Sequence, residues 1–173
     1  MSNDNSEQIE FWNGSTATSW VAAEERMDAL LAPLSQHVIA CASVQPGEAV
    51  LDIGCGCGPT SLAMAAAGAR VVGIDVSAPM LARARENGRG NARVEFIEAD
   101  ASSHPFKPEF DLLFSRFGVM FFADPAAAFT NLRDALKPSG RLCFICWQAV
   151  AENPWLAAPM ALSLYIHLTQ NVV

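Results

Sequence analysis

The sequence predicts an α/β domain with a doubly wound, Rossmann-like parallel sheet. Three observations support this fold class. Short apolar runs typical of buried strands alternate with helical segments over residues 46–147. A glycine-rich turn follows the first of these runs, and an acidic residue stands at or near the end of each of the first three. Doubly wound folds bind ligands at the carboxyl ends of their strands, so the pattern also predicts where the site lies.

Residues 50–53 form the first expected strand, and Asp52 lies near its end. The strand leads into three alternating glycines, Gly54, Gly56 and Gly58. Glycine leaves room for a ligand against the main chain, so this turn is expected to hold a nucleotide-type ligand. A dinucleotide fingerprint needs Gly or Ala at position 59, which is Pro59, and a phosphate-binding loop needs a Lys-Ser or Lys-Thr pair that this turn lacks. Asp52 would repel a phosphate, so a ligand with a cationic head fits better.

The next elements follow in order along the chain. Arg70–Asp75 is expected to form a second buried strand, and the two carboxylate oxygens of Asp75 can accept hydrogen bonds from both hydroxyls of a ribose. A helix is expected to begin directly after this strand, with Ser77 as its N-cap and Pro79 in its first turn. Residues 94–101 form the third strand, and their partial alternation favours an edge position or one solvated face.

The fourth strand is expected at Phe110–Arg116 and runs into an apolar segment at 117–122. Asp124 and a following proline predict the start of a helix that ends before residues 137–140. Arg141–Trp147 is the fifth expected strand, which gives the strand order 3-2-1-4-5.

The glycine turn and its acid resemble the motif of class I S-adenosylmethionine-dependent methyltransferases, of the small-molecule type. That motif is an acid, any residue, then Gly-x-Gly-x-Gly, and the sequence matches it without a gap. The resemblance covers about residues 46–147 and implies the cofactor S-adenosyl-L-methionine, whose sulfonium and ammonium suit Asp52. It implies methyl transfer to a small-molecule acceptor by in-line displacement. A non-catalytic domain that binds this cofactor is the alternative, and a NAD-linked oxidoreductase is a third reading that Pro59 weakens.

The resemblance also implies the residues that contact the cofactor. Asp75 would bind the ribose, Asp100 would accept from the adenine amino group, and Met80 would pack against adenine, with an ordinary place in the helix core as its equal alternative. Residues 117–122 resemble the family's segment that lines the methyl-donor pocket. The expected cofactor-binding residues are Asp52, Gly54, Gly56, Gly58, Asp75, Val76, Met80, Asp100, Ala101, Ser115 and Arg116.

No catalytic residue and no metal site is expected. The three histidines have no partner at a useful spacing, and a lone histidine is more often structural. Cys143 and Cys146 are three apart in a strand, so they should point to opposite faces, and a shared metal or disulfide is not expected there.

Three segments are expected: an N-terminal cap segment and helix at 1–45, the cofactor-binding α/β core at 46–150 and a C-terminal helix at 151–173. The N-terminal helix should run from about residue 20 to 42 and kink or divide at Pro33. The Trp-Asn-Gly sequence at residues 12–14 resembles a subgroup whose N-terminal helix caps the cofactor cleft, although for Trp12 we slightly favour packing of this helix onto the sheet.

The end of the chain is expected to depart from the family. The full fold adds an antiparallel hairpin beside the fifth strand, and residues 148–173 leave room only for a helix from Glu152 to about Leu168. The chain is therefore expected to be a truncated or a natural minimal form. Strand five would then be an edge with largely apolar side chains, which favours a homodimer or aggregation through that edge.

Composition sets the remaining expectations. The chain has 173 residues and a net charge of −7 with few Lys and Arg, which argues against a nucleic-acid partner. No apolar run is long enough to span a membrane, and the N-terminus lacks the features of a signal peptide. A cytoplasmic location with five reduced cysteines is expected.

Overall fold

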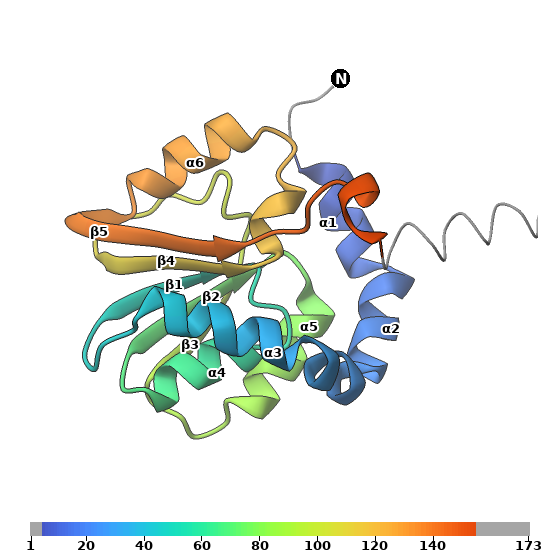
Figure 1. Ribbon diagram of the computed structural model, residues 1–173, viewed down its shortest axis with the longest axis horizontal. Coiled ribbons are helices and arrows are strands. Elements are labelled where there is room, and N and C mark those ends of the chain that lie inside the picture. The colour runs from blue at the N-terminus through green and yellow to red at the C-terminus, as the bar shows by residue number, and fades with distance from the viewer. Residues whose placement is uncertain (1–4, 155–173) are drawn as a thin grey trace, which may run out of the picture.

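Five strands form one parallel sheet in the computed structural model, which describes residues 5–154 (Figure 1). The strand order is β3-β2-β1-β4-β5, and every neighbouring pair is parallel. The strands are β1 (Ala49–Ile53), β2 (Arg70–Asp75), β3 (Val94–Glu98), β4 (Phe110–Arg116) and β5 (Leu136–Ile145). The expected fold class and strand order are thereby confirmed, and β3 takes the edge position that its partial alternation predicts.

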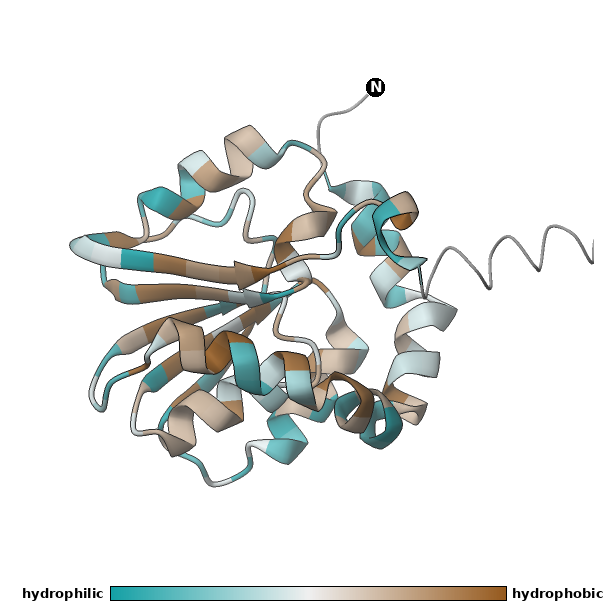
Figure 2. Ribbon diagram, viewed as in Figure 1, coloured by the Kyte–Doolittle hydropathy of each residue, from teal (hydrophilic) through white to brown (hydrophobic). Residues whose placement is uncertain are grey.

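Helices cover both faces of the sheet. Three lie on one side, α3 (Glu24–Ala42), α4 (Pro59–Ala66) and α5 (Ala78–Asn87), and α6 (Pro125–Arg133) lies on the other. One buried apolar cluster joins Val38 of α3 to Phe114 of β4, and the second joins Leu51 of β1 to Leu132 of α6. Figure 2 shows the hydrophobic residues along the strands between these layers. Strands covered on both faces are apolar almost throughout, which is why they stand out in the sequence.

The two expected helix starts are confirmed. The Ser77 hydroxyl accepts a hydrogen bond from the backbone N–H of Met80 at 3.4 Å, and the Asp124 carboxylate accepts one from Ala127 at 3.0 Å. Both helices have a proline in the first turn, where the missing N–H costs nothing.

The N-terminal part differs from the single helix expected over 20–42. It consists of α1 (Ser6–Asn13), α2 (Ser15–Ala22) and α3, and α1 and α2 stand across the carboxyl ends of the strands (Figure 1). The chain breaks at Ala23, whose φ of −102° and ψ of 7° are not helical. Pro33 lies inside α3 and does not divide it. The division therefore falls ten residues before the proline that was expected to cause it.

Strand β5 begins earlier than the expected Arg141 and ends two residues before Trp147. Leu136 pairs with Phe110 and Arg141 pairs with Leu112, so residues 137–140 all lie opposite Asp111. The Lys-Pro-Ser-Gly run is thus an irregularity inside the strand and not a turn before it. At the other end, Trp147 leaves the strand and its ring stacks on Phe117 at 4.5 Å.

Cys143 of β5 and Cys146, which directly follows the strand, lie on opposite faces of the sheet, as predicted. Cys143 packs against the cluster that contains Val38, and Cys146 packs against the cluster that contains Leu132. Beyond β5, a short 3₁₀ helix η2 (Val150–Glu152) ends at Asn153. The rest of the helix expected from Glu152 to about Leu168 lies outside the described residues.

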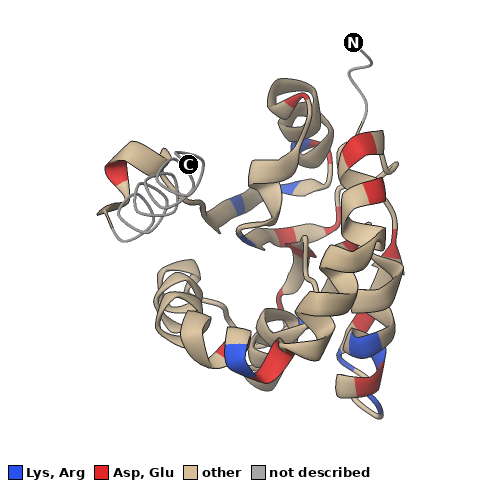
Figure 3. Ribbon diagram, turned by 90° about the vertical axis from the view of Figure 1, so that its right-hand side faces the viewer, with Lys and Arg blue, Asp and Glu red and all other residues tan. Residues whose placement is uncertain are grey.

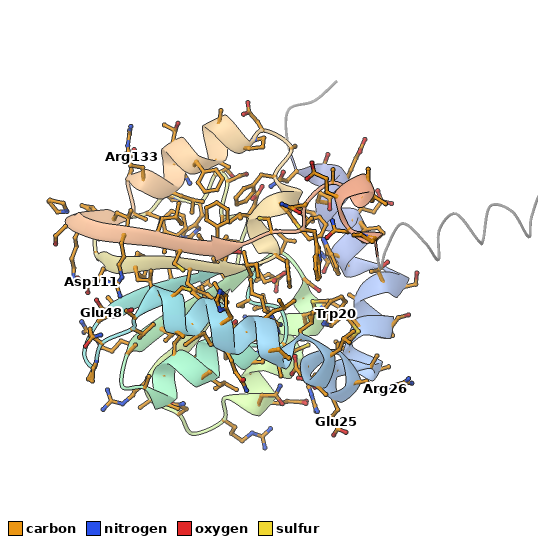
Figure 4. All side chains as sticks on the ribbon, in the orientation of Figure 1. Trp20, Glu25, Arg26, Glu48, Asp111 and Arg133 are labelled. Atoms are coloured by element: carbon orange, nitrogen blue, oxygen red, sulfur yellow. The ribbon has the colours of Figure 1, made fainter. Side chains whose placement is uncertain are left out.

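Ion pairs close the amino-terminal end of the sheet, away from Trp20 of α2 (Figure 4). The Arg141 guanidinium donates to the Glu48 carboxylate at 2.6 and 2.8 Å and to the Ala42 carbonyl, which ties β5 to the end of α3. Lys137 donates to both oxygens of Asp111 at 2.8 Å. The hydrogen bond from Arg141 lowers the pKa of Glu48, and those from the Ala49 N–H and Lys137 lower the pKa of Asp111.

Across residues 5–154, every helix is too short or too polar to serve as a membrane span.

Candidate functional site

A cavity opens at the carboxyl ends of the strands, between the sheet and the N-terminal helices. Its empty space, including the open mouth, is about 950 Å³. Figure 3 looks onto this end of the molecule. Eight of the expected residues line the cavity, namely Gly54, Gly56, Asp75, Val76, Met80, Asp100, Ala101 and Arg116, and three do not, namely Asp52, Gly58 and Ser115.

The glycine turn is held in a conformation that requires glycine. Gly54, Gly56 and Gly58 have φ values of 67°, 56° and 85°, a region that other residues rarely adopt. Gly58 also lies against the Phe96 ring, since a methyl group placed on it would be 2.8 Å from the ring edge. Gly58 therefore serves the packing of the turn onto β3, while Gly54 and Gly56 face the cavity.

The turn after β1 touches the turn after β4 backbone to backbone. A methyl group on Gly54 would lie 2.6 Å from the Gly118 Cα atom, and one on Gly118 would lie 2.4 Å from the Ile53 carbonyl oxygen. Gly118 lines the cavity at the start of the 3₁₀ helix η1 (Gly118–Phe121). The sequence indicated Gly118 only through the likeness of residues 117–122 to the family's methyl-donor segment. Its contact with Gly54 was not predicted, because the two glycines are more than sixty residues apart.

Asp52 is fully buried behind the turn and does not reach the cavity. Its Oδ2 atom accepts hydrogen bonds from the hydroxyls of Thr60, at 2.8 Å, and Ser61, at 2.6 Å, in the first turn of α4. No polar group of the described residues reaches its Oδ1 atom. Burial raises the pKa of Asp52, against the hydrogen bonds from Ser61 and Thr60. Asp52 therefore fixes the start of α4 to β1.

Ser115 has a similar supporting position. Its fully buried hydroxyl donates to the Ile53 carbonyl at 2.8 Å and accepts from the N–H groups of Gly118, at 3.1 Å, and Val119, at 3.2 Å. This one side chain joins the end of β1 to the turn after β4. Ser115 thus shapes the wall of the cavity from behind.

Asp75 lies at the end of β2 and lines the cavity. Its Oδ2 atom accepts from the Gly56 N–H at 2.8 Å and its Oδ1 atom accepts from the Ser77 N–H at 2.9 Å. Burial raises the pKa of this carboxyl, and the N–H groups of Ser77, Gly56 and Val76 oppose the shift. Each carboxylate oxygen can accept a second hydrogen bond, so capacity remains for two ribose hydroxyls.

Asp100 follows β3 and is linked to the N-terminal segment. Its Oδ1 atom accepts from the Asn5 side-chain amide and from the Ser102 N–H, both at 2.9 Å. The side-chain Oδ1 atom of Asn5 in turn accepts from the Ala123 N–H at 2.8 Å, and Asn5 is only 7% exposed. Sequence reasoning missed Asn5, because a polar residue near the N-terminus gives no local signal of a contact 95 residues away.

A second asparagine fixes the other end of α1. The Asn13 amide donates to the Val76 carbonyl at 2.8 Å and its side-chain oxygen accepts from the Ala78 N–H at 3.0 Å. No side chain of α1 is buried in the core. Its residues Gln8 and Trp12 line the cavity instead, so α1 is a cover of the site held by the two asparagines.

Aromatic rings form much of the cover. Trp12 lies edge to face against Trp20, with ring centres 6.0 Å apart, and against Phe121 at 5.4 Å, and all three line the cavity. The expectation that Trp12 packs the N-terminal helix onto the sheet is therefore wrong. Met80 is buried in α5 and also lines the cavity, so its place in the helix core is confirmed and its contact with adenine stays a prediction.

Arg116 brings a positive charge to the same cavity. Its guanidinium donates to the Ser35 hydroxyl at 2.8 Å and lies 3.9 Å from the Asp28 carboxylate of α3. Asp28 was not among the residues that the sequence indicated. The next residue, Phe117, has a φ of 69°, which is rare for an aromatic residue and is typical of strained functional segments. Burial raises the pKa of Asp28, and Arg116 opposes the shift.

The cysteines show no sign of a reactive or metal-binding role within residues 5–154. All five thiols are free, and no group of three or more His, Cys, Asp or Glu side chains comes together there. Burial raises the pKa of Cys57 to about 12 and that of Cys55 well above its ordinary value. Both thiols therefore stay protonated inside the turn.

The chemistry of the cavity fits S-adenosyl-L-methionine. Its lining holds three carboxylates, Asp28, Asp75 and Asp100, and one guanidinium, Arg116. The cofactor has a ribose, an ammonium, a sulfonium and one carboxylate and no phosphate. An acidic cavity with a single basic side chain matches that set of groups, and a phosphate-bearing dinucleotide would meet three acids.

Comparison with known proteins agrees with this chemistry. The family model described as "Methyltransferase domain" matches residues 51–144. A demethylmenaquinone methyltransferase of Clavibacter sepedonicus is 41% identical over 97 residues, which are 56% of this chain and 40% of that protein. A cypemycin N-terminal methyltransferase of a Streptomyces species is 33% identical over 132 residues, which are 73% of this chain and 54% of that protein. The chain thus spans about half the length of these curated relatives.

A solved structure gives the same result. An S-adenosylmethionine-dependent methyltransferase of Mesorhizobium loti superposes with a TM-score of 0.59 and 31% identity, over 63% of this chain and 50% of that one. Fold, site and relatives together define a class I S-adenosylmethionine-dependent methyltransferase. This chain belongs to the methyltransferase domain family, and its cofactor is S-adenosyl-L-methionine.

Proposed function

We propose that this protein transfers the methyl group of S-adenosyl-L-methionine to a small-molecule acceptor by in-line displacement. The observation that carries the proposal is the single cavity that combines the glycine turn, Asp75, Asp100 and an aromatic cover. When bound, the cofactor supplies an electrophilic methyl group on a sulfonium. The protein has to bind it, orient the acceptor and keep water out.

The cavity residues support a division of these tasks. Asp75 would accept hydrogen bonds from the ribose hydroxyls, and Asp100 would accept from the adenine amino group beside Ala101. Gly54 and Gly56 would leave space for the cofactor against the main chain. Asp52, Gly58 and Ser115, which do not line the cavity, would act by holding the turns in place.

The aromatic cover favours an acceptor with a substantial apolar part. Trp12, Trp20 and Phe121 line the cavity and would exclude water from it. Holding the acceptor and the methyl in line can supply roughly 7–11 kcal/mol of the barrier without a dedicated base. The two curated relatives are named for demethylmenaquinone and for the N-terminus of cypemycin, so their names do not converge on one kind of accepting atom.

Two expectations about organisation remain proposals. We retain the division into a cap at 1–45, a cofactor core at 46–150 and a C-terminal segment at 151–173. We also retain a homodimer through β5, the last strand on its side of the described sheet. Leu142 and Phe144 support it, because they are 40% and 44% exposed on that strand.

The test combines binding and turnover. Calorimetric titration should show that S-adenosylhomocysteine binds, that NAD does not, and that Asp75→Ala weakens binding. Incubation with methyl-labelled cofactor and a panel of small amines, phenols, thiols and quinols should then transfer label to at least one acceptor. Binding without transfer to any class would favour the non-catalytic alternative. Binding of NAD in place of S-adenosylhomocysteine would overturn the proposal.

A further inference from the structure

The groups that line the cavity are arranged in the order of the strands. Asp100 follows β3, Asp75 ends β2, the glycine turn follows β1 and Arg116 ends β4. The sheet order is β3-β2-β1-β4, so these groups succeed one another along one edge. With adenine at Asp100 and ribose at Asp75, as proposed above, the amino-acid end of the cofactor falls at the glycine turn and Arg116.

Arg116 is the one basic side chain among the described residues that line the cavity. Its side chain is 11% exposed, and the hydrogen bond to Ser35 fixes one of its two terminal nitrogens. Ser35 itself donates to the Leu31 carbonyl at 3.0 Å, so the guanidinium is anchored to α3. The remaining donors can bind a carboxylate.

Asp28 supplies the opposite charge at the same place. It lies one turn after Glu24 on α3 and lines the cavity with a side chain that is 34% exposed. Its contact with Arg116 is long, at 3.9 Å, and no described residue donates a hydrogen bond to it. Asp75 and Asp100, in contrast, each accept hydrogen bonds from the protein. Asp28 is thus the carboxylate of the cavity with the most unused acceptor capacity.

We propose that Asp28 and Arg116 form a subsite for the amino-acid end of the cofactor, in which Asp28 binds its ammonium and Arg116 binds its carboxylate. The inference rests on the proposed cofactor function and assigns Asp28 a role in it. An ammonium and a carboxylate on the same carbon present opposite charges a few ångströms apart, which matches the long Asp28–Arg116 separation. A purely structural ion pair would be expected to close to direct hydrogen-bonding distance.

The position of Glu24 supports the placement of α3. Glu24 accepts from the Asn87 amide at 2.6 Å, and Asn87 also donates to the Cys57 carbonyl at 3.1 Å. This chain of contacts fixes the first turn of α3 to the glycine turn. Asp28, on the next turn of the helix, is thereby held beside the segment along which the methionine part of the cofactor would lie.

The experiment uses cofactor analogues that each lack one group. Calorimetry would measure binding of S-adenosylhomocysteine, its desamino analogue, its decarboxylated analogue and 5′-methylthioadenosine, which has no amino-acid end. The variants are Asp28→Asn and Arg116→Gln. Glu25→Gln and Arg26→Gln are matched controls, because these exposed residues of α3 do not line the cavity (Figure 4).

Each variant should lose affinity only for ligands that have its partner group. Asp28→Asn should bind S-adenosylhomocysteine about tenfold to about 150-fold more weakly, since hydrogen bonds to charged groups are involved. It should bind the desamino analogue and 5′-methylthioadenosine as the wild type does. Arg116→Gln should lose affinity for S-adenosylhomocysteine and the desamino analogue, and keep its affinity for the decarboxylated analogue and 5′-methylthioadenosine. The two controls should bind all four ligands normally.

Other outcomes separate the alternatives. If both variants bind S-adenosylhomocysteine as tightly as the wild type, the subsite is wrong while the cofactor assignment stands. If a variant loses as much affinity for 5′-methylthioadenosine as for S-adenosylhomocysteine, the Asp28–Arg116 pair supports the fold of the cavity and the proposal is overturned. An increase in KM for an amine acceptor, with unchanged S-adenosylhomocysteine binding, would assign Asp28 to the acceptor instead. If the wild type binds none of the four ligands, the proposed function itself fails.

Discussion

Replacement of Gly118 by alanine is predicted to damage both the stability and the cofactor affinity of the protein. The added methyl group would lie 2.4 Å from the Ile53 carbonyl oxygen and 2.7 Å from the Gly54 Cα atom. Ordinary contacts of such a group begin at about 3.4 Å, so the two backbones have to move apart by roughly 1 Å. Gly118 does not have a positive φ, so the cost comes from this contact and not from backbone conformation.

The magnitude follows from what the methyl group meets. Overpacking of a tight site costs about 1–3 kcal/mol, and the upper half of that range applies because backbone atoms cannot rotate away as side chains do. With an m-value of about 2 kcal/mol/M for a domain of this size, the urea midpoint should fall by roughly 1 M. Because Gly54 lines the cavity and would be displaced, S-adenosylhomocysteine should also bind at least about tenfold more weakly.

Urea unfolding and calorimetry on the same preparation provide the assay, with Gly14→Ala as the matched control. Gly14 has a φ of −88°, and a methyl group there would be 3.4 Å from its nearest neighbour, the Glu10 carbonyl oxygen. That control should change the free energy of unfolding by a few tenths of a kcal/mol to about 1 kcal/mol, as expected at a helix N-cap. If Gly118→Ala matched the wild type in both stability and affinity, the close contact between the turns after β1 and β4 would be refuted.

Four further predictions concern the site and its surroundings. Asp75→Ala should weaken binding of S-adenosylhomocysteine by about 1.5–3 kcal/mol, and unchanged affinity by calorimetry would remove this residue from the ribose site. The pKa of Asp52 is raised by burial above 3.8, so the folded state holds its proton more tightly, and stability should fall as pH rises from about 4 through the folded pKa. In Asp52→Asn this fall in the free energy of unfolding should be absent from urea titrations between about pH 4 and about pH 8. Parallel pH profiles for the wild type and the variant would contradict the raised pKa of Asp52. Chelators should leave cofactor binding unchanged, and a loss restored by a divalent ion would reveal a metal requirement. Sedimentation velocity over a concentration series should show a dimer that Leu142→Lys weakens, and a monomer at every concentration would exclude pairing through β5.

Local signals made much of the fold predictable. The strands from β1 to β4, the glycine turn and the helix starts at Ser77 and Asp124 depend on residues next to one another, and each begins at or within one residue of the position that the sequence indicates. Strand β3 ends at Glu98, three residues before the expected Ala101. Cys143 and Cys146 also lie on the opposite faces that the period of a strand predicts, although β5 ends at Ile145.

The missed parts depend on distant contacts. Asn5 contacts Asp100 across 95 positions and Ala123 across 118, and neither pairing leaves a mark near Asn5. Asp28 has a role only because α3 brings it to Arg116. Trp12 was assigned to the sheet because an apolar residue on a helix usually faces the core, whereas α1 has no core contact and faces the cavity.

The attachment of α1 bears on how a bound cofactor could enter and leave the cavity. Five hydrogen bonds from Asn5 and Asn13 hold this helix over the cavity. At a net worth of about 0.5–1.5 kcal/mol each, they hold the cover closed by roughly 2.5–7.5 kcal/mol before the bound cofactor adds its own contacts. No side chain of α1 itself is buried, so the buried side chain that displacement of the helix would expose is that of Asn5, which precedes it. If the cofactor binds beneath α1 as proposed, its release would require these hydrogen bonds to break, and each asparagine would then influence the rate of release.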